Sequence, residues 1–216
     1  MITWLILLIS CILLLLLLFY EKREGGKSRL ITKTILSGMF VWVAFLQSSS
    51  LPDYSFYIVG GLLLCFIGDV FLALPGEKAF RAGLVAFLLG HIFYGIAFSR
   101  LIGLSAWFSP AAILFWLFSL LVFLWLRPHL KAMLIPVGIY ILVITSMVTG
   151  AWAVFAGTSL SLGGRCFVLA GAFLFYLSDL FVARNQFVKP DLINRLIGLP
   201  LYYLGQFLLA FSIGLF

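Results

Sequence analysis

Acidic residues are scarce in this sequence: only seven occur among 216 residues, and all charged residues together make up 10% of the chain. Soluble domains carry roughly 25% charged residues, so this composition excludes an ordinary soluble fold. Cysteine and histidine are scarce as well. The three cysteines (Cys11, Cys65 and Cys166) and two histidines are too few and too scattered for a disulfide framework or for the roughly three ligands of a catalytic zinc ion.

Motifs of several large enzyme classes do not occur either. The chain has no G-x-S-x-G nucleophile elbow, no P-loop and no dinucleotide fingerprint. The net charge of +7 could suggest nucleic acid, but the basic residues sit in short segments between apolar blocks, which is typical of membrane orientation. We therefore expect no metal, no cofactor and no nucleic-acid partner.

Long apolar blocks fill most of the chain, because 64% of its residues are hydrophobic. A block of about 18 or more apolar residues is typical of a transmembrane helix. The pattern predicts an all-α, polytopic transmembrane bundle with one domain over residues 1–216. Its eight predicted spans are 3–20, 31–48, 56–74, 80–99, 106–126, 133–156, 165–183 and 196–214.

The basic residues alternate between the predicted loops. Twelve of the 14 fall in the loops that follow the first, third, fifth and seventh spans, with Lys33 counted among them, whereas Arg100 and Arg165 fall in the others. By the positive-inside rule, this asymmetry places both termini on the non-cytoplasmic side of a bacterial inner membrane. Adding or losing one span in mid-chain would destroy the asymmetry, which favours eight.

Two acidic residues, Asp69 and Asp179, fall inside predicted spans and in the cytoplasmic half of the membrane. A carboxylate near the centre of a membrane helix costs roughly 2.5–3.5 kcal/mol, so such residues usually face the bundle interior and mark function. The alternative is a structural pair that only joins neighbouring helices. The other five acids, for which solvation in loops is a sufficient explanation, are Glu21, Glu24, Asp53, Glu77 and Asp191.

Polar side chains accompany the two aspartates on neighbouring spans. Each has an ordinary explanation alone, such as an interfacial tyrosine or a satisfied buried histidine. Together they predict one polar pocket inside an apolar bundle. The candidate pocket residues are His91, Tyr94, Tyr140, Tyr176, Ser178, Tyr202, Tyr203 and Gln206.

A weak internal repeat also centres on the acids. The segment Ile67–Ala73 resembles Leu177–Ala183, and Leu89–His91 resembles Leu204–Gln206. A unit of four helices would give two halves of the same orientation, related by an axis along the membrane normal. A chance match of short apolar strings is the alternative.

At these residues the chain resembles the YhhN family of membrane proteins, which includes the lysoplasmalogenases. The resemblance covers about 150 residues, and its first two spans add little to it. The segments that carry it, in the family's order, are Gly68–Leu72, Phe87–Tyr94, Tyr140–Ile144 with Met147, Gly171–Asp179 and Tyr202–Gln206, in which Gly205 stands where many members have alanine.

The resemblance implies a hydrolase that cleaves the vinyl ether bond of a lysoplasmalogen, or a related single-chain phospholipid, to a fatty aldehyde and glycerophospho-ethanolamine or -choline. Its acids would be Asp69 and Asp179. Two carboxylates in a low-dielectric site favour opposite protonation states, which suits acid–base hydrolysis. Either could be the acid; Tyr176 and the apolar run Phe173–Phe175 favour Asp179. The rival hypotheses are a proton-coupled transporter or lipid-binding protein, and a purely structural pair.

Overall fold

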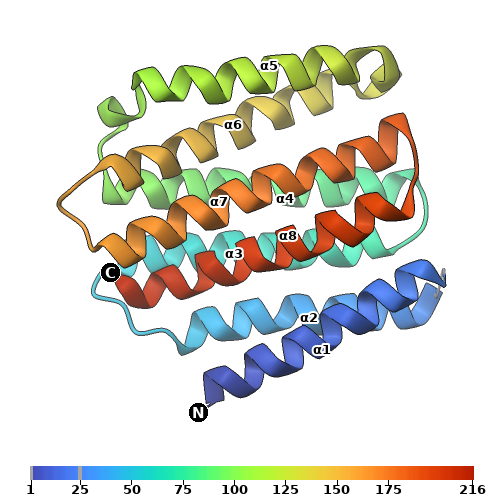
Figure 1. The fold of residues 1–216 in the computed structure, drawn as a ribbon, viewed down its shortest axis with the longest axis horizontal. Coiled ribbons are helices and arrows are strands. Elements are labelled where there is room, and N and C mark those ends of the chain that lie inside the picture. The colour runs from blue at the N-terminus through green and yellow to red at the C-terminus, as the bar shows by residue number, and fades with distance from the viewer. Residues whose placement is uncertain (1, 24–25) are drawn as a thin grey trace.

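Eight α-helices joined by short turns form the computed structural model, which describes residues 2–23 and 26–216 (Figure 1). Glu24, expected in a loop, lies outside these residues. No strand occurs within the described ranges, so the all-α prediction is confirmed. The helices are α1 (Ile2–Lys22), α2 (Gly26–Leu46), α3 (Pro52–Ala73), α4 (Glu77–Leu101), α5 (Pro110–Leu130), α6 (Leu134–Ala156), α7 (Leu162–Ala183) and α8 (Leu192–Ser212).

Local sequence signals explain where several helices begin. Pro52 and Pro110 occupy the first turns of α3 and α5, where the missing amide proton costs nothing. Side chains cap three helices: Ser109 accepts from the amide of Ala112, Ser161 from the first turn of α7, and Asp191 from the first turn of α8. Such caps satisfy amide groups that a helix start leaves unpaired.

The predicted number of separate spans is wrong. Seven helical stretches in the described chain are long and apolar enough to cross a membrane, not eight, because residues 110–156 form one uninterrupted helical stretch. We expected a loop there, after residue 126, but α5 continues through Pro128 to Leu130, and a 3-10 turn (Lys131–Met133) leads directly into α6. The chain reverses direction at this turn, where Lys131 has a φ of 45°, and α6 folds back along α5 (Figure 1). With seven such apolar stretches, the chain is a multi-pass membrane protein.

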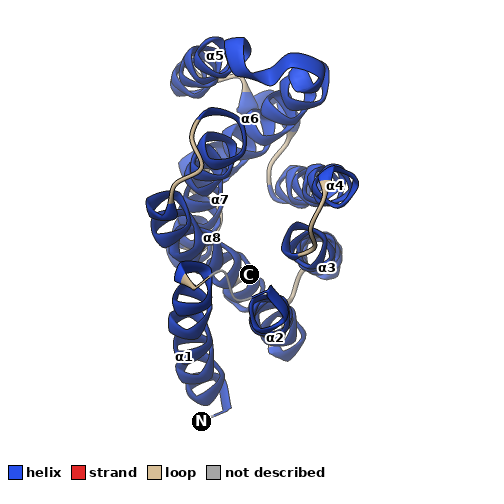
Figure 2. Ribbon diagram, turned by 90° about the vertical axis from the view of Figure 1, so that its right-hand side faces the viewer, coloured by secondary structure: helices blue, strands red, loops and turns tan. Residues whose placement is uncertain are grey.

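The end of α1 and the start of α2 lie at the same end of the bundle as the connections α3–α4, α5–α6 and α7–α8, on the right of Figure 1. We call this the basic end, because 12 of the 14 basic residues lie at or near it in the sequence. Both chain termini lie at the opposite end (Figure 1). Seen from the basic end, α2, α3 and α4 form one row beside a second row of α1, α8, α7, α6 and α5 (Figure 2).

Two helix pairs, α3 with α4 and α7 with α8, pack most closely, and glycines make this approach possible. A Cβ at Gly90 would lie 3.2 Å from the carbonyl oxygen of Gly61, and a Cβ at Gly205 would lie 2.8 Å from that of Gly171. Membrane helices commonly use small residues in this way. The two contacts occupy matching positions in the halves of the proposed repeat and support it, although the repeat stays a prediction.

Helices α1 and α5 present apolar side chains outwards. Trp4, Leu15, Leu114 and Leu121 are each at least 65% exposed, as expected of helices whose outer face meets lipid rather than water. The core lies between the two rows and is rich in buried aromatic rings, including Phe40, Phe98 and Phe175 among its largest fully buried side chains.

Candidate active site

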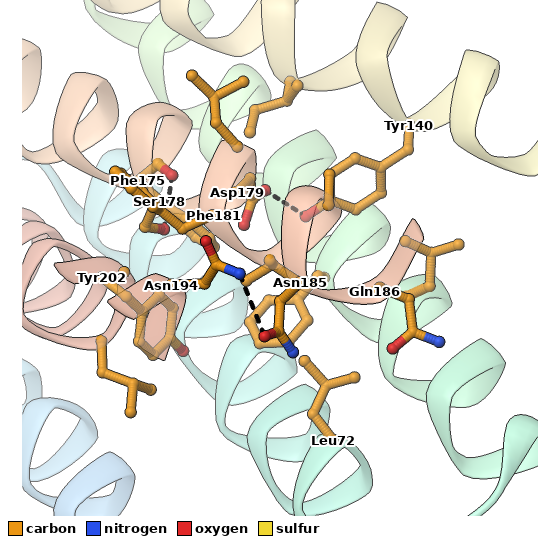
Figure 3. Close-up of a pocket in the computed structure, with 18 of the residues that line it drawn as sticks. Leu72, Tyr140, Phe175, Ser178, Asp179, Phe181, Asn185, Gln186, Asn194 and Tyr202 are labelled. Atoms are coloured by element: carbon orange, nitrogen blue, oxygen red, sulfur yellow. Dashed lines mark hydrogen bonds between the residues drawn. The ribbon is translucent and has the colours of Figure 1, made fainter. Parts of the chain in front are cut away.

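A cavity of about 310 Å³ lies in the half of the bundle nearest the basic end (Figure 3). Side chains from all eight helices line it, and both intramembrane aspartates, Asp69 from α3 and Asp179 from α7, are among them. Most of its wall is apolar. The apolar lining residues include Leu72, Leu84, Phe87, Val122, Leu126, Val137, Ile141, Ile144, Phe175 and Leu199. A mostly apolar pocket with a few convergent polar groups is the usual form of a small-molecule site.

Asp69 is enclosed by three hydrogen-bond donors. Its side chain is 2% exposed, and its Oδ1 forms an ion pair with the ammonium group of Lys33 at 3.0 Å. Its Oδ2 accepts hydrogen bonds from the hydroxyls of Ser37 at 2.6 Å and Tyr202 at 2.7 Å. The Lys33 side chain is itself only 9% exposed. A buried charge pair with further hydrogen bonds avoids most of the penalty of burying either charge alone.

Asp179 has a more open and less basic environment. Its side chain is 18% exposed, and its Oδ2 accepts a hydrogen bond of 2.6 Å from the Tyr140 hydroxyl (Figure 3). The Nε2 of His91 lies 2.9 Å from the same hydroxyl and 3.4 Å from Oδ2 of Asp179. Because the phenol donates its single proton to Asp179, Nε2 of His91 must carry the proton of the second bond. Asp179 therefore ends a chain of three polar groups and faces the cavity.

The eight predicted pocket residues divide into two groups. Tyr140, Tyr176, Ser178 and Tyr202 line the cavity, whereas His91, Tyr94, Tyr203 and Gln206 lie behind its wall. Tyr94, Gln206 and Tyr203 each have a buried partner. The Tyr94 hydroxyl donates to Oε1 of Gln206 at 2.7 Å, and the Tyr203 hydroxyl bonds Ser37 at 3.1 Å. These residues support the site rather than touch its contents.

The residues expected to shield Asp179 have different surroundings. The Tyr176 hydroxyl bonds Ser119, which also bonds Thr145, and not the acid. Phe173 is 39% exposed. Phe175 lines the cavity and packs against His91 and Tyr202 at ring-centroid distances of 4.4 and 5.1 Å.

Several residues that line the cavity or contact Asp69 escaped prediction. Glu21 was expected in a loop, and Lys33 was counted with the loop charges although it falls at the start of a predicted span. Each belongs to a helix, is largely buried and lines the cavity. Ser37 lies one helical turn after Lys33, so the two share a face of α2; this spacing was the available signal. Oε2 of Glu21 lies 2.7 Å from Nη1 of Arg195 and 3.7 Å from Nη1 of Arg29. All three residues of this ionic cluster line the cavity and belong to helix ends near the basic end.

The arrangement is suited to proton transfer. Among the described residues, no group of three His, Cys, Asp or Glu side chains could hold a metal ion. The cavity instead offers one carboxyl group backed by a tyrosine and a histidine, and one carboxylate paired with a lysine. Carboxyl groups in different environments can serve as acid and as charge stabiliser in one reaction.

Comparisons with known proteins agree in pointing to one family. The model of the YhhN family matches residues 2–213. The lysoplasmalogenase TMEM86A of Bos taurus is 34% identical over 158 residues, which is 70% of this chain and 62% of the bovine protein. The human TMEM86A gives the same values. The lysoplasmalogenase TMEM86B of Mus musculus is 34% identical over 172 residues, or 79% of this chain and 69% of the mouse protein. The chain thus spans under two thirds of the length of the TMEM86A proteins. No solved structure matches it.

Proposed function

The chain belongs to the YhhN family, and on this premise we propose that it is a membrane-embedded hydrolase of the lysoplasmalogenase type. Its substrate is a lysoplasmalogen or a related single-chain phospholipid with a vinyl ether bond. Its products are a fatty aldehyde and the glycerophospho headgroup, ethanolamine or choline. The names of its relatives support the reaction class, and the cavity supports a lipid substrate.

The observation that carries this proposal is a single cavity that joins two carboxyl groups to an apolar wall and an ionic end. A lysolipid has the same three parts: an apolar tail, an ether linkage and a charged headgroup. With the headgroup at the basic end, the tail would extend towards Ser119 and Ile144 and the ether linkage would lie near the aspartates. Positioning of this kind can supply a large share of an enzyme's rate enhancement.

We assign the role of acid to Asp179. Its carboxyl group faces the cavity and has no lysine or arginine partner among the described residues, whereas Asp69 has Lys33. Tyr140 and His91 hold the Asp179 side chain in place. Asp69, already anionic in its ion pair, is suited to stabilise positive charge that develops on the substrate.

The reaction balances without a covalent enzyme intermediate. Asp179 donates its proton to the β-carbon of the vinyl ether, which leaves an oxocarbenium ion on the carbon bonded to oxygen. Asp69 stabilises this cation, and water adds to the same carbon while its proton returns to Asp179. The resulting hemiacetal loses its hydroxyl proton, its carbon–oxygen bond to glycerol breaks, and the glyceryl oxygen takes up a proton. The sum is one vinyl ether and one water converted to one aldehyde and one alcohol.

The test measures aldehyde release from a lysoplasmalogen by the detergent-purified chain. We expect Asp179→Asn to reduce kcat by at least about 10³-fold, because proton transfer contributes up to about 10⁴-fold and the amide cannot donate a proton to carbon. Asp69→Asn should reduce it by about 10²-fold or more through loss of cation stabilisation. Asp53→Asn is the matched control, since Asp53 is exposed at the other end of α3 and does not line the cavity. Wild-type rates in both cavity variants would overturn the proposal.

The structure favours a hydrolase over the transporter hypothesis. Helices α3 and α7 run without a break through Asp69 and Asp179, whereas transporters commonly bind their substrates at interrupted helices. The lining residues of the cavity lie in the half of the bundle nearest the basic end. Proton-coupled uptake of a lysolipid into proteoliposomes, without cleavage, would reverse this preference.

The charge asymmetry supports an orientation. We place the basic end in the cytoplasm of a bacterial cell, with both termini across the inner membrane, because basic loops are retained on the cytoplasmic side. The lipid would then enter from the cytoplasmic leaflet. Alkaline phosphatase fused after Phe216 should be active, since that enzyme folds only outside the cytoplasm; an inactive fusion that is present in normal amounts would refute the orientation.

A further inference from the structure

The ionic cluster of Glu21, Arg29 and Arg195 has no part in the chemistry proposed for the aspartates. We propose that Arg29 and Arg195 form a binding subsite for the phosphodiester group of the substrate, and that this subsite makes the enzyme selective for lysophospholipids over single-chain ethers without phosphate. The inference rests on the proposed function, because it concerns the same cavity and the same substrate.

The two guanidinium groups converge on one point. Nη1 of Arg195 and Nη1 of Arg29 lie 2.7 and 3.7 Å from the same oxygen of Glu21. A second nitrogen of Arg29 donates to the carbonyl oxygen of Ala73 at the end of α3, which fixes the guanidinium beside the helix that carries Asp69. Arginine side chains held in a planar fork are well suited to bind phosphate oxygens.

The cluster has unused binding capacity and the appropriate charge. The buried Nε of Arg29 has no hydrogen-bond partner among the described residues. Both side chains are about 30% exposed, so a ligand in the cavity can reach them. Two guanidinium groups and one carboxylate carry a net charge of +1, which a phosphodiester monoanion neutralises. Glu21 can then accept the ammonium group of an ethanolamine headgroup.

The distance from the aspartates fits a glycerophospho unit. Arg29 lies four residues before Lys33 on the same face of α2, so it is displaced by about 6 Å towards the basic end. Arg195 lies seven residues before Tyr202 on α8, a displacement of about 10 Å. Both Lys33 and Tyr202 contact Asp69. In a lysoplasmalogen, about six bonds separate the ether carbon from phosphorus, which is roughly 7 Å when extended. A phosphate between the arginines would therefore place the ether bond near the aspartates.

The test compares two substrates with the same alkenyl chain: the 1-alkenyl glycerophosphoethanolamine and the phosphate-free 1-alkenyl glycerol. We expect the wild-type ratio of their kcat/KM values to fall about tenfold or more in Arg29→Gln and in Arg195→Gln, mainly through KM, because each loses a charge-assisted hydrogen bond. Arg81→Gln is the matched control: Arg81 lies at the same end but is exposed, pairs with Glu77 and does not line the cavity. An unchanged ratio in both cavity variants would overturn the subsite.

Two further measurements keep the result interpretable. Removing Arg195 leaves Glu21 with one partner fewer and could unfold the chain. The double variant Glu21→Gln/Arg195→Gln is therefore tested as well. It should show the same fall in the ratio of the two kcat/KM values. Binding of the non-cleavable 1-alkyl glycerophosphoethanolamine is measured separately. Arginine-dependent binding without cleavage of any vinyl ether would refute the proposed function and retain the subsite. Equal cleavage of both substrates by the wild type would refute the subsite and retain the proposed function.

Competition with inorganic phosphate distinguishes a lipid headgroup from free phosphate as the ligand of the two arginines. A headgroup subsite should bind free phosphate much more weakly than the lysophospholipid, because only the lipid has an apolar tail to bury in the cavity. If inorganic phosphate competes with the 1-alkyl lipid at equal concentration, the cluster is a site for free phosphate, and the assignment to the headgroup is overturned.

Discussion

The buried ion pair between Lys33 and Asp69 gives the sharpest prediction about stability. At 3.0 Å, the Coulomb attraction is about 5 kcal/mol with an effective dielectric constant of about 20. Breaking such a pair by removing one partner typically costs about 3–5 kcal/mol. The hydroxyls of Ser37 and Tyr202 continue to bond the carboxylate, so we expect the lower value, about 3 kcal/mol, for Lys33→Met.

For a chain of this size, 1 kcal/mol corresponds to about 2–4 °C in Tm. Lys33→Met should therefore lower the Tm by about 6–12 °C, measured in detergent from the fluorescence of the native tryptophans. The double variant Lys33→Met/Asp69→Asn removes both charges and should recover at least half of the loss, so that the double-mutant cycle shows coupling. The matched control is Arg81→Met. Arg81 forms an even shorter contact of 2.6 Å with Glu77, but the two side chains are 54% and 71% exposed, and such pairs contribute at most about 1 kcal/mol.

The reasoning fails if Lys33→Met lowers the Tm no more than Arg81→Met does and the cycle shows no coupling. In that case the Lys33 ammonium would not be neutralising a buried carboxylate, and Asp69 could not be the charge stabiliser of the proposed reaction.

Other variants test separate parts of the structure. Tyr140→Phe removes the hydroxyl that donates to the α7 aspartate and should lower kcat about fivefold, since one buried hydrogen bond contributes about 1 kcal/mol; an unchanged kcat would contradict the positioning role. Gly205→Ala places a methyl group 2.8 Å from a backbone oxygen of α7 and should cost about 1–3 kcal/mol of stability. Gly163→Ala, whose new methyl group would meet its nearest neighbour at 4.0 Å, should be close to neutral; equal Tm losses would show that the close approach is unimportant. Glu21→Gln leaves two guanidinium groups without their carboxylate and should lower the Tm by a few degrees, less in high salt because salt screens partly exposed charges.

Much of the fold was predictable because the bilayer restricts the alternatives. Backbone groups in lipid must be satisfied within the chain, so apolar blocks of this length predict helices. The two aspartates were identifiable for the same reason, since a carboxyl group is costly at their depth. His91, Tyr140 and Asp179 lie on three different predicted spans, and the structure brings them within hydrogen-bonding distance.

The partners of Asp69 were less predictable. Lys33 lies three residues into a predicted span, where a lysine can equally extend its ammonium group to the membrane surface or turn inwards. The choice depends on how α2 packs against α3, which is tertiary information. Glu21 and Arg195 are 174 residues apart, and their helices meet only in the folded bundle. The sequence identified these residues as charged but not as lining one cavity.

The reversal between α5 and α6 falls inside the predicted loop, but the helical form of this segment was not foreseen. Pro128 suggested a break, because proline removes a helical hydrogen bond. The helix nevertheless continues for two further residues, and the reversal falls at Lys131. A positive φ is uncommon for a residue other than glycine, so the exact position of the reversal could not be read from the sequence.

The different partners of the two aspartates have a consequence for the proposed repeat. Asp69 is bonded by Lys33, eight residues into α2, and Asp179 by Tyr140, seven residues into α6. In the proposed repeat of two similar halves, these are corresponding places, so exchanging tyrosine for lysine in one half accounts for this difference between the two carboxyl sites. With tyrosine in both places, such a chain would hold two equivalent acids and no fixed counter-charge. With the lysine on one side only, the two halves have distinct surroundings for their carboxyl groups within one cavity.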